Sequence, residues 1–175
     1  ARNLPVYSET DDCKEIQITE EEKIVLVMQG SGINPDRGYE EAIQAMQYLP
    51  SPYLLLIIGG GTKWNELQTL TNSLQLNEKV KFIPRVPFEI LRCYTRQAQV
   101  GLSLDKPVAL NYHLSLPNKL FDYLHAGVPV LASNLTEVEK IVSGYNVGQC
   151  VDEVEPKKIA AAVESAKSRG LKLAV

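Results

Sequence analysis

The sequence SLPNKLFDYLHAGVPVLAS, from Ser115 to Ser133, joins an amphipathic helix to a short buried strand. Pro117 suits the first turn of a helix because its backbone angle is already fixed. Four apolar side chains recur at helical spacing and are expected to face a core: Leu116, Leu120, Tyr123 and Leu124. Gly127 ends the predicted helix, since glycine readily takes the left-handed conformation of a helix C-terminus. The apolar run at 128–131 follows as a strand.

Strand and helix patterns alternate along the rest of the chain in the same way. Strands are predicted at residues 23–28, 53–58, 79–83, 99–104, 128–132 and 147–151, and the first of them holds a continuous apolar run typical of a strand buried on both faces. Apolar residues at helical spacing occur at 42–49, 62–74, 88–96, 137–142 and 156–169. No hairpin turn separates two strands. We therefore expect an α/β, Rossmann-like domain in three layers, with a parallel sheet of about six strands.

Length and charge favour one soluble domain that follows a leading segment. A chain of 175 residues with 45% hydrophobic residues suffices for one well-packed domain. Residues 1–22 carry seven acidic and two basic residues without clear periodicity, which predicts a linker or leading segment before a body at 23–175. The other fourteen acidic and sixteen basic residues leave that body slightly positive. This small excess suits an anionic small ligand and excludes a nucleic-acid surface.

Cysteine usage and hydropathy bear on the cellular compartment. Cys13, Cys93 and Cys150 are odd in number, widely spaced and without the spacing of metal ligands, which favours a reducing compartment. The sequence shows no signal peptide and no apolar run long enough to cross a bilayer. We expect a cytoplasmic location. Peripheral association with the inner face of a membrane, through a part outside this chain, is left open.

Two glycine clusters follow the first two predicted strands and raise the alternative of a dinucleotide site. That fingerprint needs a further glycine three residues after the second one. Pro35 stands there after Gly30 and Gly32, and Trp64 stands there after the cluster at 59–61. Neither side chain permits the close helix–strand packing that the fingerprint requires. The dinucleotide interpretation fails, and the glycine–lysine–Ser/Thr triplet of a P-loop is also absent from the sequence.

Lys119 and Asp122 are three residues apart on the predicted helix and can form a surface ion pair. A cation in the first turn of a helix is unusual, however, because the helix dipole there favours an anion. A phosphate bound at this helix start would be attracted by the lysine and the dipole together. The spacing alone leaves both interpretations open.

The residues LPNKLFDYL at 116–124 and AGVPV at 126–130 resemble the donor-binding signature of GT-B glycosyltransferases, specifically the large retaining family 4. The resemblance covers residues 23–170 and implies that the chain is the C-terminal, donor-binding domain of such an enzyme. In that family an acidic residue on the signature helix reaches the ribose of a nucleotide sugar. Asp122 occupies this position and is the expected ribose ligand.

The resemblance also implies which residues surround the diphosphate. Arg37, followed by Gly38, matches a basic residue that reaches the diphosphate in the family, and Lys119 is the second expected cation. Ser31 stands where the family commonly has arginine, and Gly32 belongs to the loop that approaches the donor. Four further residues are expected near the base or the sugar: Arg85, Pro117, Asn118 and Glu137.

One departure from the family concerns the first of two glutamates that it often carries eight positions apart. Leu114 stands at that position and cannot make the polar contact with the sugar, so no catalytic residue is assigned. Backbone groups or one of three neighbouring side chains are the alternatives for that contact: Asn111, His113 or Ser115.

The resemblance implies a hexosyltransferase that moves a sugar from a nucleotide diphosphate-sugar, such as a UDP- or GDP-sugar, to an acceptor in polysaccharide or glycoconjugate synthesis. It further implies no metal, no cofactor, a missing N-terminal acceptor-binding domain and no transfer by this chain alone. The alternatives are a nucleotide-sugar epimerase of the same architecture and a non-catalytic nucleotide-binding module. The missing acid at Leu114 and the missing arginine at Ser31 keep the module in consideration.

Overall fold

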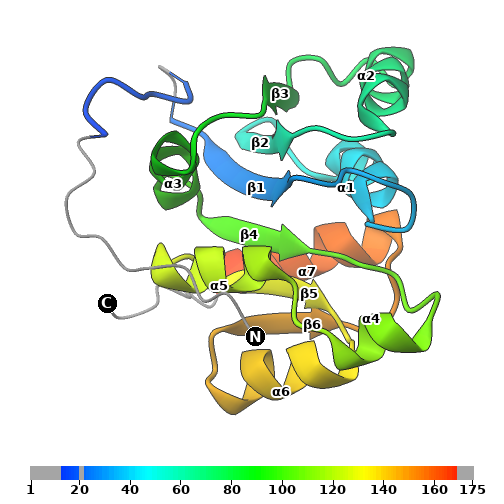
Figure 1. Ribbon diagram of the computed structural model, residues 1–175. Helices are drawn as coiled ribbons and strands as arrows, with labels where there is room; N and C mark the ends of the chain where they lie inside the picture. Colours follow the sequence, from blue (N-terminus) through cyan, green and yellow to red (C-terminus); the bar gives the residue numbers. More distant parts are fainter. Residues whose placement is uncertain (1–12, 20–21, 169–175) are drawn as a thin grey trace.

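The computed structural model describes residues 13–19 and 22–168, which form a three-layer α/β domain (Figure 1). One sheet of six parallel strands has the order β3-β2-β1-β4-β5-β6. The strands are β1 (Ile24–Gly30), β2 (Tyr53–Gly59), β3 (Val80–Pro84), β4 (Val100–Ser103), β5 (Val130–Ser133) and β6 (Gly148–Val151). The predicted Rossmann-like fold is confirmed. Parts of the predicted leading segment (1–12 and 20–21) and the chain end (169–175) lie outside the described residues.

Helices cover both faces of the sheet. One face packs against α1 (Tyr39–Ala45), α2 (Trp64–Ser73) and α7 (Pro156–Ser168), and the other against α3 (Phe88–Arg96), α5 (Asn118–His125) and α6 (Thr136–Gly144). Along β1 the side chains point alternately into the two cores, Leu26 into the first and Val27 into the second. Burial on both faces explains why this strand is a continuous apolar run. None of the described helices is both long and apolar enough to span a membrane.

The strand order reverses at β1, and this reversal determines where a ligand has room to bind. The chain moves outward from β1 through β2 to β3, and then returns to pair β4 with the other side of β1. Connections that leave the carboxyl ends of β1 and β4 therefore run in opposite directions and open a crevice. The topology alone thus places a candidate site at this edge of the sheet.

Three local features differ from the sequence prediction. Helix α5 begins at Asn118, and Pro117 precedes it in an extended conformation with ψ 138° instead of forming its first turn. The segment after β4, where no helix is predicted before Pro117, contains the short helix α4 (Leu110–Leu114), and a 3₁₀ turn, η1 (Met46–Tyr48), follows α1. No residue of α4 is buried, so no apolar periodicity marks this helix in the sequence.

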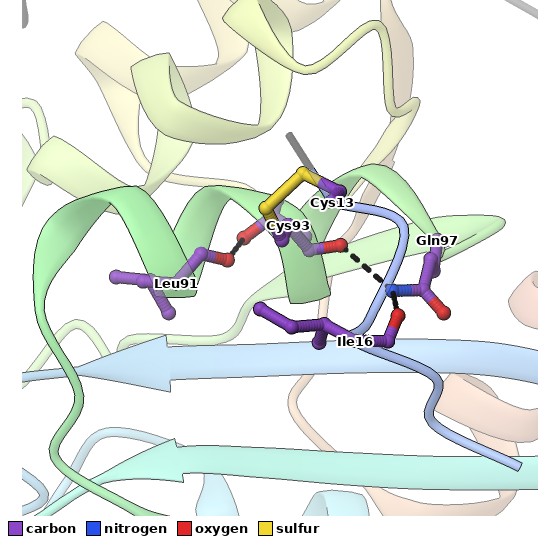
Figure 2. The surroundings of a disulfide bond; sticks show 6 residues. Cys13, Ile16, Leu91, Cys93 and Gln97 are labelled. Carbon is purple, nitrogen blue, oxygen red and sulfur yellow. Dashed lines mark hydrogen bonds between the residues drawn. A yellow bond between two sulfur atoms is a disulfide. The ribbon is translucent and has the colours of Figure 1, made fainter. Parts of the chain in front are cut away.

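A disulfide joins Cys13 of the leading segment to Cys93 of α3, 80 residues away in sequence (Figure 2). Beside it, the Gln97 side-chain amide donates to the Ile16 carbonyl oxygen at 2.7 Å, and Ile18 is buried in the second core. No pairing of cysteines was predicted from the sequence, where their odd number and wide spacing favoured a reducing compartment. Spacing along the chain does not reveal which distant residues the fold brings together.

Replacing Leu120 by alanine tests how the signature helix is anchored. Leu120 is fully buried, so Leu120→Ala should lower the free energy of unfolding by about 2–5 kcal/mol. The matched control is Leu110→Ala, since Leu110 on α4 is 72% exposed, and it should change that free energy by less than about 0.5 kcal/mol. Urea unfolding followed by circular dichroism measures both. Equal effects would contradict the burial of this face of α5.

Counting thiols tests the disulfide. Protein purified without reductant, denatured and alkylated should carry one labelled cysteine, Cys150, and three after reduction. In the folded protein Cys150 should react slowly, because burial raises its pKa to about 11 and little thiolate exists at neutral pH. Mass spectrometry gives the count. Three labels without reduction would show that Cys13 and Cys93 are not bonded.

Candidate functional site

A pocket of about 730 Å³ opens at the carboxyl ends of β1 and β2, beside the start of α5. It is lined by eight of the residues assigned from the sequence: Ser31, Gly32, Arg37, Arg85, Pro117, Asn118, Lys119 and Asp122. Glu137 is not brought to this pocket. It lies on α6, where its carboxylate pairs with Lys140 at 2.6 Å.

A buried carboxylate that sequence reasoning missed, Asp105, joins the two expected cations. Its Oδ1 atom lies 3.3 Å from Lys119 Nζ and 3.4 Å from Arg37 Nη1. The side chains of Asp105 and Lys119 are 4% and 10% exposed, whereas that of Arg37 is 35% exposed. Lys119 therefore forms its ion pair inside the pocket wall with Asp105, and not at the surface with Asp122.

The electrostatic surroundings of Lys119 are unusual for a lysine. Burial lowers its pKa, and the neighbouring Arg37 guanidinium lowers it further, while the Asp105 carboxylate raises it. The Lys119 ammonium also lies 5.8 Å from the centre of the Tyr39 ring, and the Arg37 guanidinium lies 4.9 Å from that of Tyr112. These ring contacts favour cations. With Lys119 protonated, the cluster of Arg37, Lys119 and Asp105 carries two positive charges and one negative charge.

A close approach of two backbone segments brings Arg37 to Asp105. Gly38 adopts φ 77°, and a Cβ atom there would lie 2.3 Å from the Leu104 carbonyl oxygen. Only glycine fits this contact between the loop after β1 and the segment after β4. The arginine–glycine pair recognised in the sequence thus has a structural reason, since the glycine permits the position of the arginine.

Asp122 is held by a second polar group that sequence reasoning missed, Gln29 at the end of β1. The Gln29 side-chain amide donates to Asp122 Oδ2 at 3.1 Å, and its carbonyl oxygen accepts from the Thr95 hydroxyl at 2.7 Å. Burial raises the pKa of Asp122, and the hydrogen bond from Gln29 opposes that rise. Gln29 itself is buried, so it fixes one carboxylate oxygen of Asp122 from the core side.

Arg85 connects two glycine loops at the pocket rim. Its Nη2 donates to the Ser31 carbonyl oxygen at 2.5 Å and to the Gly60 carbonyl oxygen at 3.4 Å. The guanidinium therefore stabilises the loops after β1 and β2 against each other.

The sequence could have indicated both missed residues, Gln29 and Asp105, because each is a polar residue at the carboxyl end of a predicted strand. Gln29 is a polar residue at the next-to-last position of the otherwise apolar strand β1, and Asp105 follows β4 by two residues. Polar side chains at the carboxyl ends of parallel strands face the ligand edge of the sheet. The described residues contain no group of three or more His, Cys, Asp or Glu side chains placed to hold a metal ion.

Comparison with known proteins gives the family. Residues 8–174 match the family described as Glycosyl transferases group 1, which covers nearly the whole chain. The fold and this match together define a Rossmann-like glycosyltransferase domain. This chain belongs to the group 1 glycosyl transferases. No curated protein matches it.

Solved structures of glycosyltransferases share the fold. WaaG, a glycosyltransferase involved in lipopolysaccharide biosynthesis, is 18% identical with a TM-score of 0.67, over 86% of this chain and 40% of WaaG. Anabaena HepE in complex with UDP is 16% identical with a TM-score of 0.67, over 87% of this chain and 41% of HepE. The C-terminal domain of the Francisella tularensis protein LpcC is 15% identical with a TM-score of 0.66, over 83% and 76%. The chain thus spans about two fifths of the length of WaaG and HepE.

Proposed function

We propose that this chain is the donor-binding domain of a retaining, family 4 glycosyltransferase and binds a nucleotide diphosphate-sugar in the pocket beside α5. The observation that carries the proposal is the convergence of Arg37 and Lys119 on that pocket, at the start of a helix. Family membership supports it, and so does the similarity to HepE, whose structures contain UDP and UDP-glucose.

The chemistry of the diphosphate suits this arrangement. A nucleoside diphosphate gains negative charge as the glycosidic bond breaks, and fixed cations stabilise that charge. Arg37 and Lys119 supply two cations, and the first backbone N–H groups of α5 lack a side-chain cap. The helix dipole favours an anion at the same point. In our proposal these groups bind the diphosphate together, with Ser31 and Gly32 approaching it from the loop after β1.

The remaining roles follow from position along α5. Asp122 lies one helical turn beyond Lys119 and in our proposal accepts hydrogen bonds from the ribose hydroxyls. Arg85, Pro117 and Asn118 lie near the base or the sugar. Glu137, expected there from the sequence, lies on α6 in its pair with Lys140. We assign no catalytic residue to this chain.

The complete enzyme, in this proposal, adds an acceptor-binding domain and acts in polysaccharide or glycoconjugate synthesis at the cytoplasmic face of a membrane or in the cytoplasm. The chain alone binds the donor without transferring the sugar. A non-catalytic nucleotide-binding module is the second candidate, because Leu114, at the position of the family's first glutamate, is apolar and 60% exposed on α4. Sugar transfer by the full-length protein separates the two.

Nucleotide binding without metal is the first test. Calorimetry should show that UDP, GDP or ADP binds the domain equally well with and without EDTA. Lys119→Gln and Arg37→Gln should each weaken binding about ten-fold or more, since a hydrogen bond to a charged group contributes about 1.5–3 kcal/mol. Lys140→Gln, on the exposed face of α6, is the matched control and should leave affinity unchanged. Binding that disappears on chelation, or survives both substitutions, would reject the site.

The ribose contact is tested with the Asp122→Asn variant. The substitution keeps the shape of the side chain and removes its charge, and charge-assisted hydrogen bonds are the stronger kind. It should weaken binding of UDP by about ten-fold and binding of 2′-deoxy-UDP much less. Titration calorimetry on both proteins with both nucleotides gives the four affinities. Equal losses for the two nucleotides would show that Asp122 does not contact the 2′-hydroxyl.

A further inference from the structure

Asp105 is the only carboxylate that contacts Arg37 and Lys119 among the described residues, and one oxygen atom serves both. Its side chain is 4% exposed, and burying a carboxylate charge is costly unless cations pair with it. The three groups come from separate parts of the chain: the loop after β1, the segment after β4 and the first turn of α5. Asp105 also lines the pocket, next to the proposed diphosphate position.

We propose that Asp105 is a positioning residue of the donor site, whose carboxylate holds Arg37 and Lys119 together and maintains the positive charge of Lys119. This inference rests on the proposed function, because the two cations matter to a ligand only if a diphosphate binds between them. Asp105 acts through the cations and makes no bond to the phosphate, since two anions repel each other.

The groups around Lys119 show why its charge depends on Asp105. Arg37 is a like charge, and burial disfavours the ammonium. Tyr39 and Tyr123, which interact electrostatically with the same carboxylate, are buried phenols whose pKa burial raises, so both are neutral at physiological pH. Among the described residues, Asp105 is the one negatively charged neighbour of Lys119, and it favours the protonated amine both as a charge and as a hydrogen-bond acceptor. Without it, Lys119 loses its proton at a lower pH.

Removing the carboxylate has two opposite effects on a diphosphate, and pH separates them. A buried anion beside the phosphate repels it, so an uncharged residue 105 favours binding as long as Lys119 stays protonated. Once the pH rises through the lowered pKa of Lys119, the cation is lost and binding weakens. A purely structural role would instead lower affinity by the same factor at every pH.

The titration of Lys119 in the free protein tests the inference without a ligand. The 13C-labelled Lys119 side chain, identified by its absence in Lys119→Arg, should titrate in Asp105→Asn at a pH lower by about one unit or more than in the wild type. Asp105→Glu keeps the charge and should restore most of the wild-type value. Asp152→Asn removes an exposed acid beyond β6 and should change nothing. An unchanged Lys119 titration in Asp105→Asn would overturn the proposal.

A second variant covers the case in which Asp105→Asn does not fold. The Arg37 side chain is 35% exposed. Arg37→Gln removes the positive charge that repels the Lys119 ammonium, and Asp105 then pairs with Lys119 only. The Lys119 titration should then move to higher pH. A value that stays the same or falls would contradict a carboxylate shared by the two cations.

The affinity profile for UDP gives the functional readout. Calorimetry between about pH 7 and 10 uses a terminal phosphate that is already ionised, because its second pKa lies near 6. The pH at which affinity declines should lie about one unit or more lower in Asp105→Asn than in the wild type and Asp152→Asn. Parallel profiles would overturn the inference. If UDP does not bind the wild type at all, the proposed function fails, and the lysine titration still decides the role of Asp105.

Discussion

Asp105 lies at the carboxyl edge of the sheet almost out of contact with water, where burying a carboxylate is costly unless cations pair with it. Arg37 and Lys119 meet that requirement, which ties the loop after β1 and the start of α5 to the segment after β4. Gly38 allows the two backbones to approach closely enough for this. The same contacts that compensate one buried charge thereby gather two cations at the crevice where the strand order reverses.

Helix α5 divides its residues between the core and the pocket. Leu120 and Tyr123 are fully buried against the sheet, and the Tyr123 hydroxyl donates to the Leu102 carbonyl oxygen at 3.0 Å. Lys119 and Asp122 line the pocket from the next face of the helix, one turn apart. Because the buried side chains fix the rotation of α5, they also fix the positions of the proposed phosphate and ribose ligands.

The fold was predictable because burial on both faces leaves a direct trace, as in the apolar run from Ile24 to Met28. The signature helix likewise led to Lys119 and Asp122 at the pocket. Asp105 was missed because its burial depends on partners from two distant segments, and a single polar residue after a strand has no hydrophobic periodicity to mark it. The Cys13–Cys93 bond was missed for the same reason, since 80 residues separate its two ends.

A crystal structure of the domain with bound UDP tests the account most directly. The account predicts diphosphate oxygens within about 3 Å of the Arg37 and Lys119 nitrogens, with Asp105 still behind both cations and Asp122 at the ribose hydroxyls. UDP bound with its phosphates away from both cations, while Arg37 and Lys119 contact only Asp105, would contradict it.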